Sequence, residues 1–131
     1  MTPQIKGKLV VLKEDYDVLM SYAGKSKTGP QKVYASELLE SLGNAEVVST
    51  DEFPGDMIRL NSKVTIRDKV ARYNYVYTIV LPEEADHRKG KVSVLAPIGA
   101  ALLGYRTGED VIWQMHSGKR YFTIMAVTHL F

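Results

Sequence analysis

Apolar residues in the first third of the chain recur every three to four positions, which is the spacing of α-helices. One stripe predicts a helix from about residue 13 to residue 23, and a second predicts a helix that ends at Gly43. The first stripe contains Leu12, Tyr16, Leu19 or Met20, and Ala23, and the second contains Tyr34 or Ala35, Leu38, Leu39 and Leu42. The intervening K-S-K-T-G-P has the composition of a turn. The two helices therefore form a short antiparallel hairpin.

After residue 45 the apolar pattern changes to the alternation of β-strands. The alternation is clearest in residues 71–80, where Tyr73, Tyr75, Tyr77 and Ile79 share one face. Similar runs predict further strands at residues 57–60, 63–67, 92–95, 111–115 and 121–129. Residues 46–48 either begin a strand or form an extended linker. The last two strands flank H-S-G-K, a hairpin turn signal.

One segment, KVSVLAPIGAALLGYRTGEDV at residues 91–111, joins a strand to a short helix through a tight corner. Pro97 stands at the first helical position, and Gly104 stands just past the last one, which is the usual punctuation of a short helix. The segment therefore predicts a strand, a corner, a short helix, a turn and another strand.

These elements together predict an α+β fold. Strands joined mainly by hairpins indicate an antiparallel sheet, and the short helix after Pro97 covers one of its faces. We place a boundary between residues 45 and 46. The helical hairpin then occupies residues 1–45, and the sheet domain occupies residues 46–131.

Composition limits the classes of function. The 131 residues include 45% hydrophobic residues, and no apolar run approaches the roughly 20 residues of a membrane helix. The chain has no cysteine, and its N-terminus lacks a signal-peptide pattern, so we expect a cytoplasmic protein without a membrane partner. Seventeen basic and 15 acidic residues are mixed along the chain, so unaided binding to nucleic acid is not expected.

No pattern in the chain predicts a catalytic residue, a metal site or a cofactor. The three histidines, His87, His116 and His129, lie far apart in different predicted elements. The acidic cluster at Glu14, Asp15 and Asp17 suits the start of a helix, where the helix dipole favours negative charge. The alternating tyrosines fit a half-buried strand face, although sheet-borne aromatic rings can also stack nucleic-acid bases.

Three lysines lie at the tip of the predicted helical hairpin. Lys25, Lys27 and Lys32 are spaced over the turn between the two helices. Solvation of an exposed loop accounts for them. The alternative is that this basic tip contacts a negatively charged surface, such as nucleic acid or an acidic region of a protein partner.

Residues 93–109 resemble a signature of the C-terminal, FKBP-like domain of the bacterial Gre transcript-cleavage factors. That signature reads S-x-x-S-P-[IVM]-[GA]-x-A-L-[IL]-G-x-x-x-G-D/E. The positions that fit it are Ser93, Pro97, Ile98, Gly99, Ala101, Leu102, Leu103, Gly104 and Gly108, whereas Ala96 departs from it. The resemblance extends over about the last two-thirds of the chain, and it is particularly similar to the small Rnk type, the regulators of nucleoside diphosphate kinase.

The resemblance implies bacterial RNA polymerase as the partner, with nucleic acid reached only indirectly through the polymerase. In the family the corner before the short helix contacts the polymerase, and it corresponds here to Leu95, Ala96, Pro97 and Ile98. Gre factors also insert a long coiled coil whose acidic tip holds a catalytic Mg²⁺. Here the helices span only about 16–21 Å, and the tip carries lysines. We therefore expect a non-enzymatic transcription regulator that does not stimulate transcript cleavage and that competes with Gre factors.

The FKBP-like topology also suggests two alternatives. One is a prolyl isomerase or chaperone, an activity that uses an aromatic pocket with a tryptophan in the short helix. The single tryptophan, Trp113, lies instead in the following predicted strand. The other alternative is a generic protein-binding module with a different partner.

Overall fold

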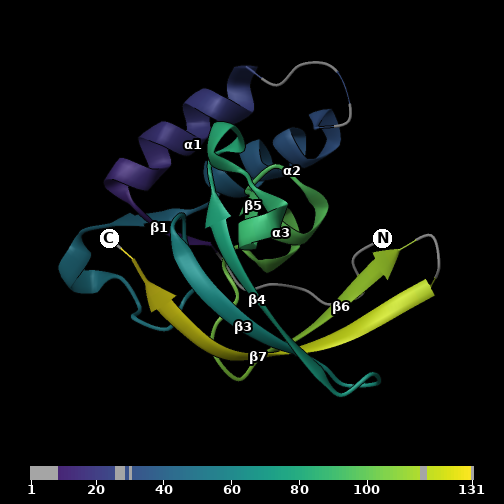
Figure 1. The fold of residues 1–131 in the computed structure, drawn as a ribbon. Helices are drawn as coiled ribbons and strands as arrows, with labels where there is room; N and C mark the ends of the chain where they lie inside the picture. The colour runs from purple at the N-terminus through teal and green to yellow at the C-terminus, as the bar shows by residue number, and fades with distance from the viewer. Residues whose placement is uncertain (1–8, 26–28, 30, 116–117, 131) are drawn as a thin grey trace.

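A computed structural model describes residues 9–25, 29, 31–115 and 118–130 of the chain (Figure 1). The helical hairpin comprises α1 (Lys13–Lys25) and α2 (Lys32–Gly43), which confirms the two helices expected from the apolar stripes. The turn residues 26–28 and 30 lie outside the described residues.

Two short strands flank the helical hairpin. β1 (Val10–Leu12) and β2 (Glu46–Val48) pair in parallel, with Val11 opposite Val47. Neither the strand at residues 10–12 nor this pairing was expected from the sequence. The boundary that we placed between residues 45 and 46 assigns β2 to the sheet domain. Among the described residues, however, β2 pairs only with β1, which comes before α1. The pair closes the base of the hairpin.

The second sheet has five strands in the order β5-β4-β3-β7-β6. Their bounds are β3 (Ser62–Asp68), β4 (Tyr73–Val80), β5 (Lys91–Ser93), β6 (Asp110–Met115) and β7 (Gly118–His129). The β3–β4, β3–β7 and β6–β7 pairs are antiparallel. At one edge β5 runs parallel to β4. The α+β class is confirmed, with this one parallel pair in an otherwise antiparallel sheet.

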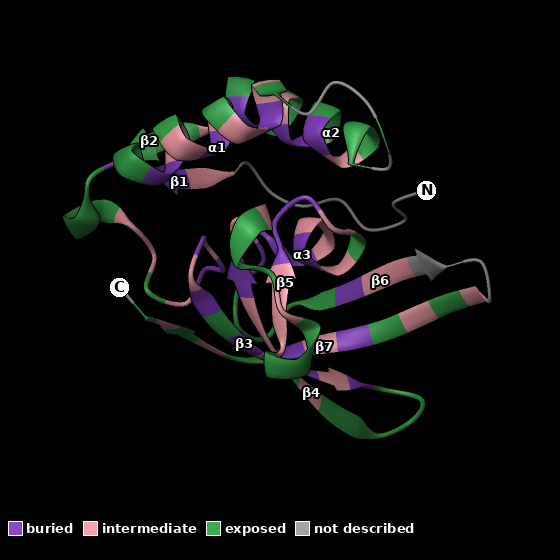
Figure 2. Cartoon of the chain, turned by 45° about the horizontal axis from the view of Figure 1, so that its top comes forward, coloured by how far each residue is buried: buried purple, intermediate pink, exposed green. Residues whose placement is uncertain are grey.

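Short helices fill the connections. The charged stretch after β4 contains η2 (Pro82–Glu84) and η3 (His87–Lys89), while η1 (Thr50–Glu52) follows β2. The expected helix after Pro97 is α3 (Pro97–Leu102). It lies between the helical hairpin and the sheet, as Figures 1 and 2 show.

The strand expected at residues 57–60 is not present. Met57 forms only an isolated bridge with Arg106. Ile58 instead donates its N–H to the carbonyl of Tyr105 at 2.8 Å and accepts the N–H of Gly104 at 3.0 Å. Three of the four side chains in this segment are apolar and buried, because the segment crosses the core beside the end of α3. Its side chains therefore do not alternate between a buried and an exposed face as those of a sheet strand do.

One continuous hydrophobic core joins the helical hairpin to the sheet. Leu19 and Leu42 from the hairpin belong to the same buried cluster as Leu102 of α3 and Ile66 and Ile79 of the sheet. The hairpin therefore packs on the sheet domain through α3. The opposite face of the sheet has no helix over it among the described residues (Figure 2).

Candidate functional site

The corner before α3 is built by local hydrogen bonds. The Ser93 hydroxyl accepts the N–H of Leu95 at 3.0 Å, and the Ser93 carbonyl accepts the N–H of Ala96 at the same distance. Ala96 is extended, at φ −90° and ψ 160°, because the proline ring that follows disfavours a helical conformation at this position. Pro97 then begins the helix. This sequence of contacts ends the expected strand 92–95 at Ser93 and makes Val94 and Leu95 part of a turn.

Gly99 allows α3 to approach the end of β5. A Cβ atom at this position would lie 2.0 Å from the Ser93 carbonyl oxygen and 2.9 Å from its carbon. Both atoms belong to the backbone and cannot move aside alone. Glycine is therefore required here for the geometry of the corner, which gives a physical reason for its place in the sequence signature.

The four residues proposed for docking have different exposures. Leu95 is 1% exposed and belongs to the core, so its side chain anchors the corner from inside. Pro97 is exposed, while Ala96 and Ile98 are half-buried. A partner that meets this corner therefore contacts Pro97 first, with Ala96 and Ile98 beside it.

A buried ion pair fixes the helical hairpin to the sheet domain. Arg59 donates from Nε to Asp15 Oδ2 at 2.7 Å and from Nη2 to Asp15 Oδ1 at 2.8 Å. The two side chains are only 12% and 7% exposed. A second contact on the same helix joins the Tyr22 hydroxyl to the Glu83 carboxylate in η2. The hairpin is thus held at two points along α1.

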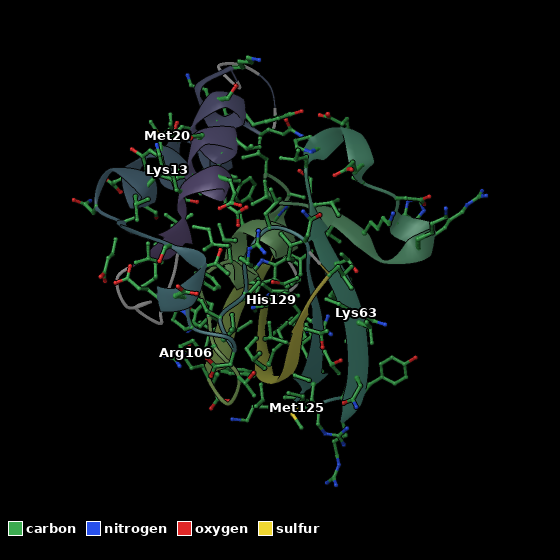
Figure 3. All side chains as sticks on the ribbon, turned by 90° about the vertical axis from the view of Figure 1, so that its left-hand side faces the viewer. Lys13, Met20, Lys63, Arg106, Met125 and His129 are labelled. Atoms are coloured by element: carbon green, nitrogen blue, oxygen red, sulfur yellow. The ribbon has the colours of Figure 1, made fainter. Side chains whose placement is uncertain are left out.

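A histidine lies next to this ion pair. His129 Nδ1 is 2.9 Å from the Ser62 hydroxyl, which already accepts the backbone N–H of Arg59 at 2.8 Å. In the tautomer with Nδ1 unprotonated, the hydroxyl donates its proton to Nδ1 while it accepts the Arg59 N–H. Burial and the nearby Arg59 charge lower the pKa of His129. His129 is half-buried at the end of β7 and is labelled in Figure 3.

The hairpin tip is described only in part. Lys25 and Lys32 are exposed, and Lys27 lies outside the described residues. The tip sequence KSKTGPQK contains no carboxylate. Within the residues that the structure describes, no three histidine or acidic side chains gather closely enough to hold a metal ion.

The tyrosines of β4 belong to an aromatic cluster. The rings of Tyr75 and Tyr77 stack at 6.2 Å, and Tyr75 also meets Phe122 edge-on at 6.4 Å. Trp113 of β6 packs against Phe122 at 6.3 Å. Tyr73 at the end of the strand remains 61% exposed. The half-buried strand face expected from the alternation is therefore present, with one ring open to solvent.

Sequence reasoning missed the ion pair between Asp15 and Arg59. We assigned Asp15 to the helix dipole, but it lies one helical turn before buried Leu19, on the same face of α1. An acidic residue in line with an apolar stripe is a signal for a buried partner, because an unpaired buried carboxylate is costly. Arg59 offered a matching signal, since it interrupts an otherwise apolar run from Met57 to Leu60.

A comparison with protein families gives a match over residues 53–129, to the family described as "Transcription elongation factor, GreA/GreB, C-term". The chain belongs to the GreA/GreB family. The matched region contains the whole five-stranded sheet, α3 and the corner before it. The resemblance seen in the sequence is confirmed.

Relatives of two kinds are similar to the chain. A GreA transcription elongation factor from Amoebophilus asiaticus is 37% identical over 93 residues, which cover 71% of this chain and 59% of that protein. The regulator of nucleoside diphosphate kinase from Escherichia coli K12 is 36% identical over 84 residues, covering 64% of this chain and 62% of that protein. The matched part of the chain thus spans less than two-thirds of the length of either relative.

Solved structures agree with the family. A GreA/GreB transcription elongation factor from Nitrosomonas europaea has a TM-score of 0.81 at 30% identity, covering 95% of this chain and 100% of that chain. The Gfh1 protein of Thermus thermophilus has a TM-score of 0.50 at 23% identity, which indicates a likeness of fold alone. In the described part of this GreA/GreB family member, the helices are too short or too polar to span a membrane.

Proposed function

We propose that this chain is a non-enzymatic transcription regulator that binds bacterial RNA polymerase near its secondary channel. Membership of the GreA/GreB family supports polymerase as the partner. In this proposal the protein works in the cytoplasm, and nucleic acid is met within the complex with polymerase. The observation that carries the docking site is the exposed Pro97, held at a corner whose neighbours are fixed by Ser93 and Gly99.

The protein does not stimulate transcript cleavage in this proposal. Cleavage in Gre factors is tied to carboxylates at the tip of a long coiled coil, where they hold a metal ion. Here α1 and α2 have 13 and 12 residues, which is about 20 Å of helix. The tip between them carries Lys25, Lys27 and Lys32 and no acidic residue. Occupation of the docking site without cleavage makes the protein a competitor of Gre factors.

The substitution Pro97→Asp tests the docking site. Aspartate is favourable in the first turn of a helix, so α3 keeps a suitable first residue while the corner gains a charge and Ala96 loses the restriction imposed by the proline ring. We expect binding to core RNA polymerase to be lost while the circular dichroism spectrum stays native. Pro82→Asp is the matched control, because Pro82 also begins a short helix, η2. Unchanged binding by the Pro97 variant would remove the corner from the interface.

Competition and cleavage are measured with the same purified proteins. A Gre factor should displace this protein from polymerase, and backtracked elongation complexes should not release cleaved RNA when this protein is added alone. Binding that a Gre factor does not displace would place the protein elsewhere on the polymerase. Release of cleaved RNA would contradict the non-enzymatic assignment.

A second candidate function rests on the aromatic cluster. Tyr73 is exposed, and Tyr75, Tyr77 and Trp113 are half-buried on the sheet face that α3 partly covers. Aromatic surfaces of this kind bind extended or proline-containing peptides. This would suit an FKBP-like isomerase, a chaperone or a general protein-binding module. A protease-coupled assay on a proline-containing peptide separates the candidates, since turnover that Tyr75→Ala abolishes would favour the isomerase.

A further inference from the structure

The five-stranded sheet has an outer face that none of the described helices covers (Figures 1 and 2). Along β3, buried residues alternate with Lys63, Thr65 and Arg67, which therefore point to this outer face. On β7, Lys119 and Tyr121 also point outward, because Phe122 is buried on the other side. In Figure 3 Lys63 lies at the periphery of the molecule.

Strand pairing brings two basic segments together that are about fifty residues apart in the sequence. Arg67 of β3 is the register partner of Thr123 on β7. Just past β3, the N–H of Lys69 donates to the carbonyl of Tyr121 at 2.8 Å. Lys119 lies two positions before Tyr121 on β7 and shares its face. We call the resulting row of Lys63, Arg67, Lys69 and Lys119 the outer-face stripe.

The outer-face stripe is only partly neutralised. Lys69 pairs with Asp110 at 2.9 Å, and Asp110 is the single carboxylate among the described outward positions of β3, β4, β6 and β7. The four cations of the stripe and Asp110 together carry a net charge of +3, although the whole chain carries only +2. Arg67 donates to the neutral Asn74 side chain at 2.9 Å. The face is therefore a local positive surface that the overall charge conceals.

The chemistry around the stripe suits nucleic acid better than protein. Its neighbours on the same face are the hydroxyl and amide side chains of Thr65, Asn74, Thr78, Thr123 and Thr128, together with two apolar side chains, Val76 opposite Thr65 and Ile112 opposite Tyr121. Lysine, arginine, threonine and asparagine are the side chains that contact phosphates, whereas lysine is depleted in the centre of protein–protein interfaces. Tyr121, which is 39% exposed, lies within the stripe and offers a ring on which a base can stack.

We propose that the outer face of the sheet binds a single strand of nucleic acid, with phosphates along the outer-face stripe and a base on Tyr121. From Lys63 to Lys69 the stripe extends about 20 Å. A stacked strand advances about 3.4 Å per nucleotide, so the stripe faces about six nucleotides. The inference goes beyond polymerase binding and does not depend on it. It revises the expectation that nucleic acid is reached only through polymerase. That expectation rested on the mixed charges along the sequence, whereas the strand pairing gathers positive charges on one face of the sheet.

Direct binding by the purified protein tests the inference without polymerase. The probes are fluorescein-labelled oligouridine RNA and oligothymidine DNA of about 12 nucleotides, twice the length that the stripe faces. Fluorescence anisotropy is recorded from about 20 to 200 mM salt. Three phosphate contacts predict that the logarithm of the binding constant falls with the logarithm of salt with a slope of about −2. Comparison of the two probes reports any preference for RNA or DNA.

Charge and ring variants locate the contact. The triple variant Lys63→Gln, Arg67→Gln, Lys119→Gln should bind at least about tenfold more weakly at low salt, with a slope close to zero. The control variant Lys13→Gln, Arg88→Gln, Lys89→Gln removes the same charge from exposed positions elsewhere and should bind like the wild type. Tyr121→Ala should weaken binding about fivefold or more, and Tyr121→Phe should not.

Three results would overturn the inference. The first is no anisotropy change at the lowest salt. The second is an equal loss in the two triple variants, which would mean general charge attraction. The third is displacement of the oligonucleotide by polyglutamate at equal charge concentration, which would assign the face to an acidic protein surface. Circular dichroism of every variant guards against loss of folding.

Discussion

Asp15 of α1 and Arg59 of the sheet domain form a two-point ion pair, with nitrogen–oxygen distances of 2.7 and 2.8 Å. The pair joins residues 44 positions apart and is almost completely buried. The backbone N–H of Arg59 also donates to the hydroxyl of Ser62, the first residue of β3. Arg59 therefore links the helical hairpin to the start of β3. The orientation of helices α1 and α2 relative to the Pro97 corner therefore depends on it.

Asp15→Ala should destabilise the protein by about 3 kcal/mol, because it leaves the Arg59 guanidinium buried without its carboxylate. Urea unfolding measures the loss. The double variant Asp15→Leu, Arg59→Met should lose less than Asp15→Ala alone, since no unpaired charge remains. Asp17→Ala breaks only the exposed pair with Lys13 and should cost about 0.5 kcal/mol or less. Equal losses for Asp15 and Asp17 would contradict the structural role of the buried pair.

Gly99→Ala should destabilise the fold by about 2–3 kcal/mol, because the added methyl group overlaps the Ser93 backbone. The corner before α3 would have to open to admit it. Gly24→Ala is the matched control, as Gly24 lies in α1 and a Cβ there meets no atom within 4 Å. That variant should gain about 0.5–1 kcal/mol from helix propensity. Thermal unfolding of both variants distinguishes a steric requirement from a general effect of glycine.

Much of the fold follows from local patterns in the sequence. Helices α1, α2 and α3 and the strands β3, β4, β6 and β7 were predicted because each has a clear period or a proline and glycine at its ends. The pairing of β1 with β2 was not predicted, because a strand of three residues is too short to show an alternating pattern. The segment 57–60 resembled a strand because buried loops and buried strands share the same apolar composition.

For the candidate sites too, local features could be predicted from the sequence and contacts between distant segments could not. The start of α3 at Pro97 is a local feature and could be expected from sequence, but the turn at Val94 and Leu95 and the inward direction of Leu95 could not. The Asp15–Arg59 pair and the outer-face stripe both join segments distant in the chain. Only the packing of α1 and the β3–β7 register bring their members together.

His129 should make stability depend on pH. Its pKa is lowered in the folded protein, chiefly by burial and then by Arg59. Protonation is therefore easier in the unfolded chain, and stability should fall as the pH decreases below the ordinary histidine pKa of about 6.5 and through the folded value. Urea unfolding at several pH values above about 5, where carboxylates stay charged, isolates this effect.

His129→Asn should flatten that pH profile, because asparagine can accept the Ser62 hydroxyl proton but does not titrate. His87→Asn is the control, since His87 is exposed on η3. It should keep the wild-type pH profile. An unchanged profile in the His129 variant would mean that another group causes the acid sensitivity.

The lysines of the hairpin tip should matter for polymerase binding only at low ionic strength. Lys25→Gln, Lys27→Gln, Lys32→Gln removes three charges that the proposed function places near the polymerase channel. We expect severalfold weaker binding at about 50 mM salt and little change at about 300 mM, because salt screens exposed charges. The control Lys13→Gln, Arg88→Gln, Lys89→Gln keeps the tip intact and alters net charge equally. If both triple variants weaken binding alike, the tip makes no particular contact and the lysines only solvate the turn.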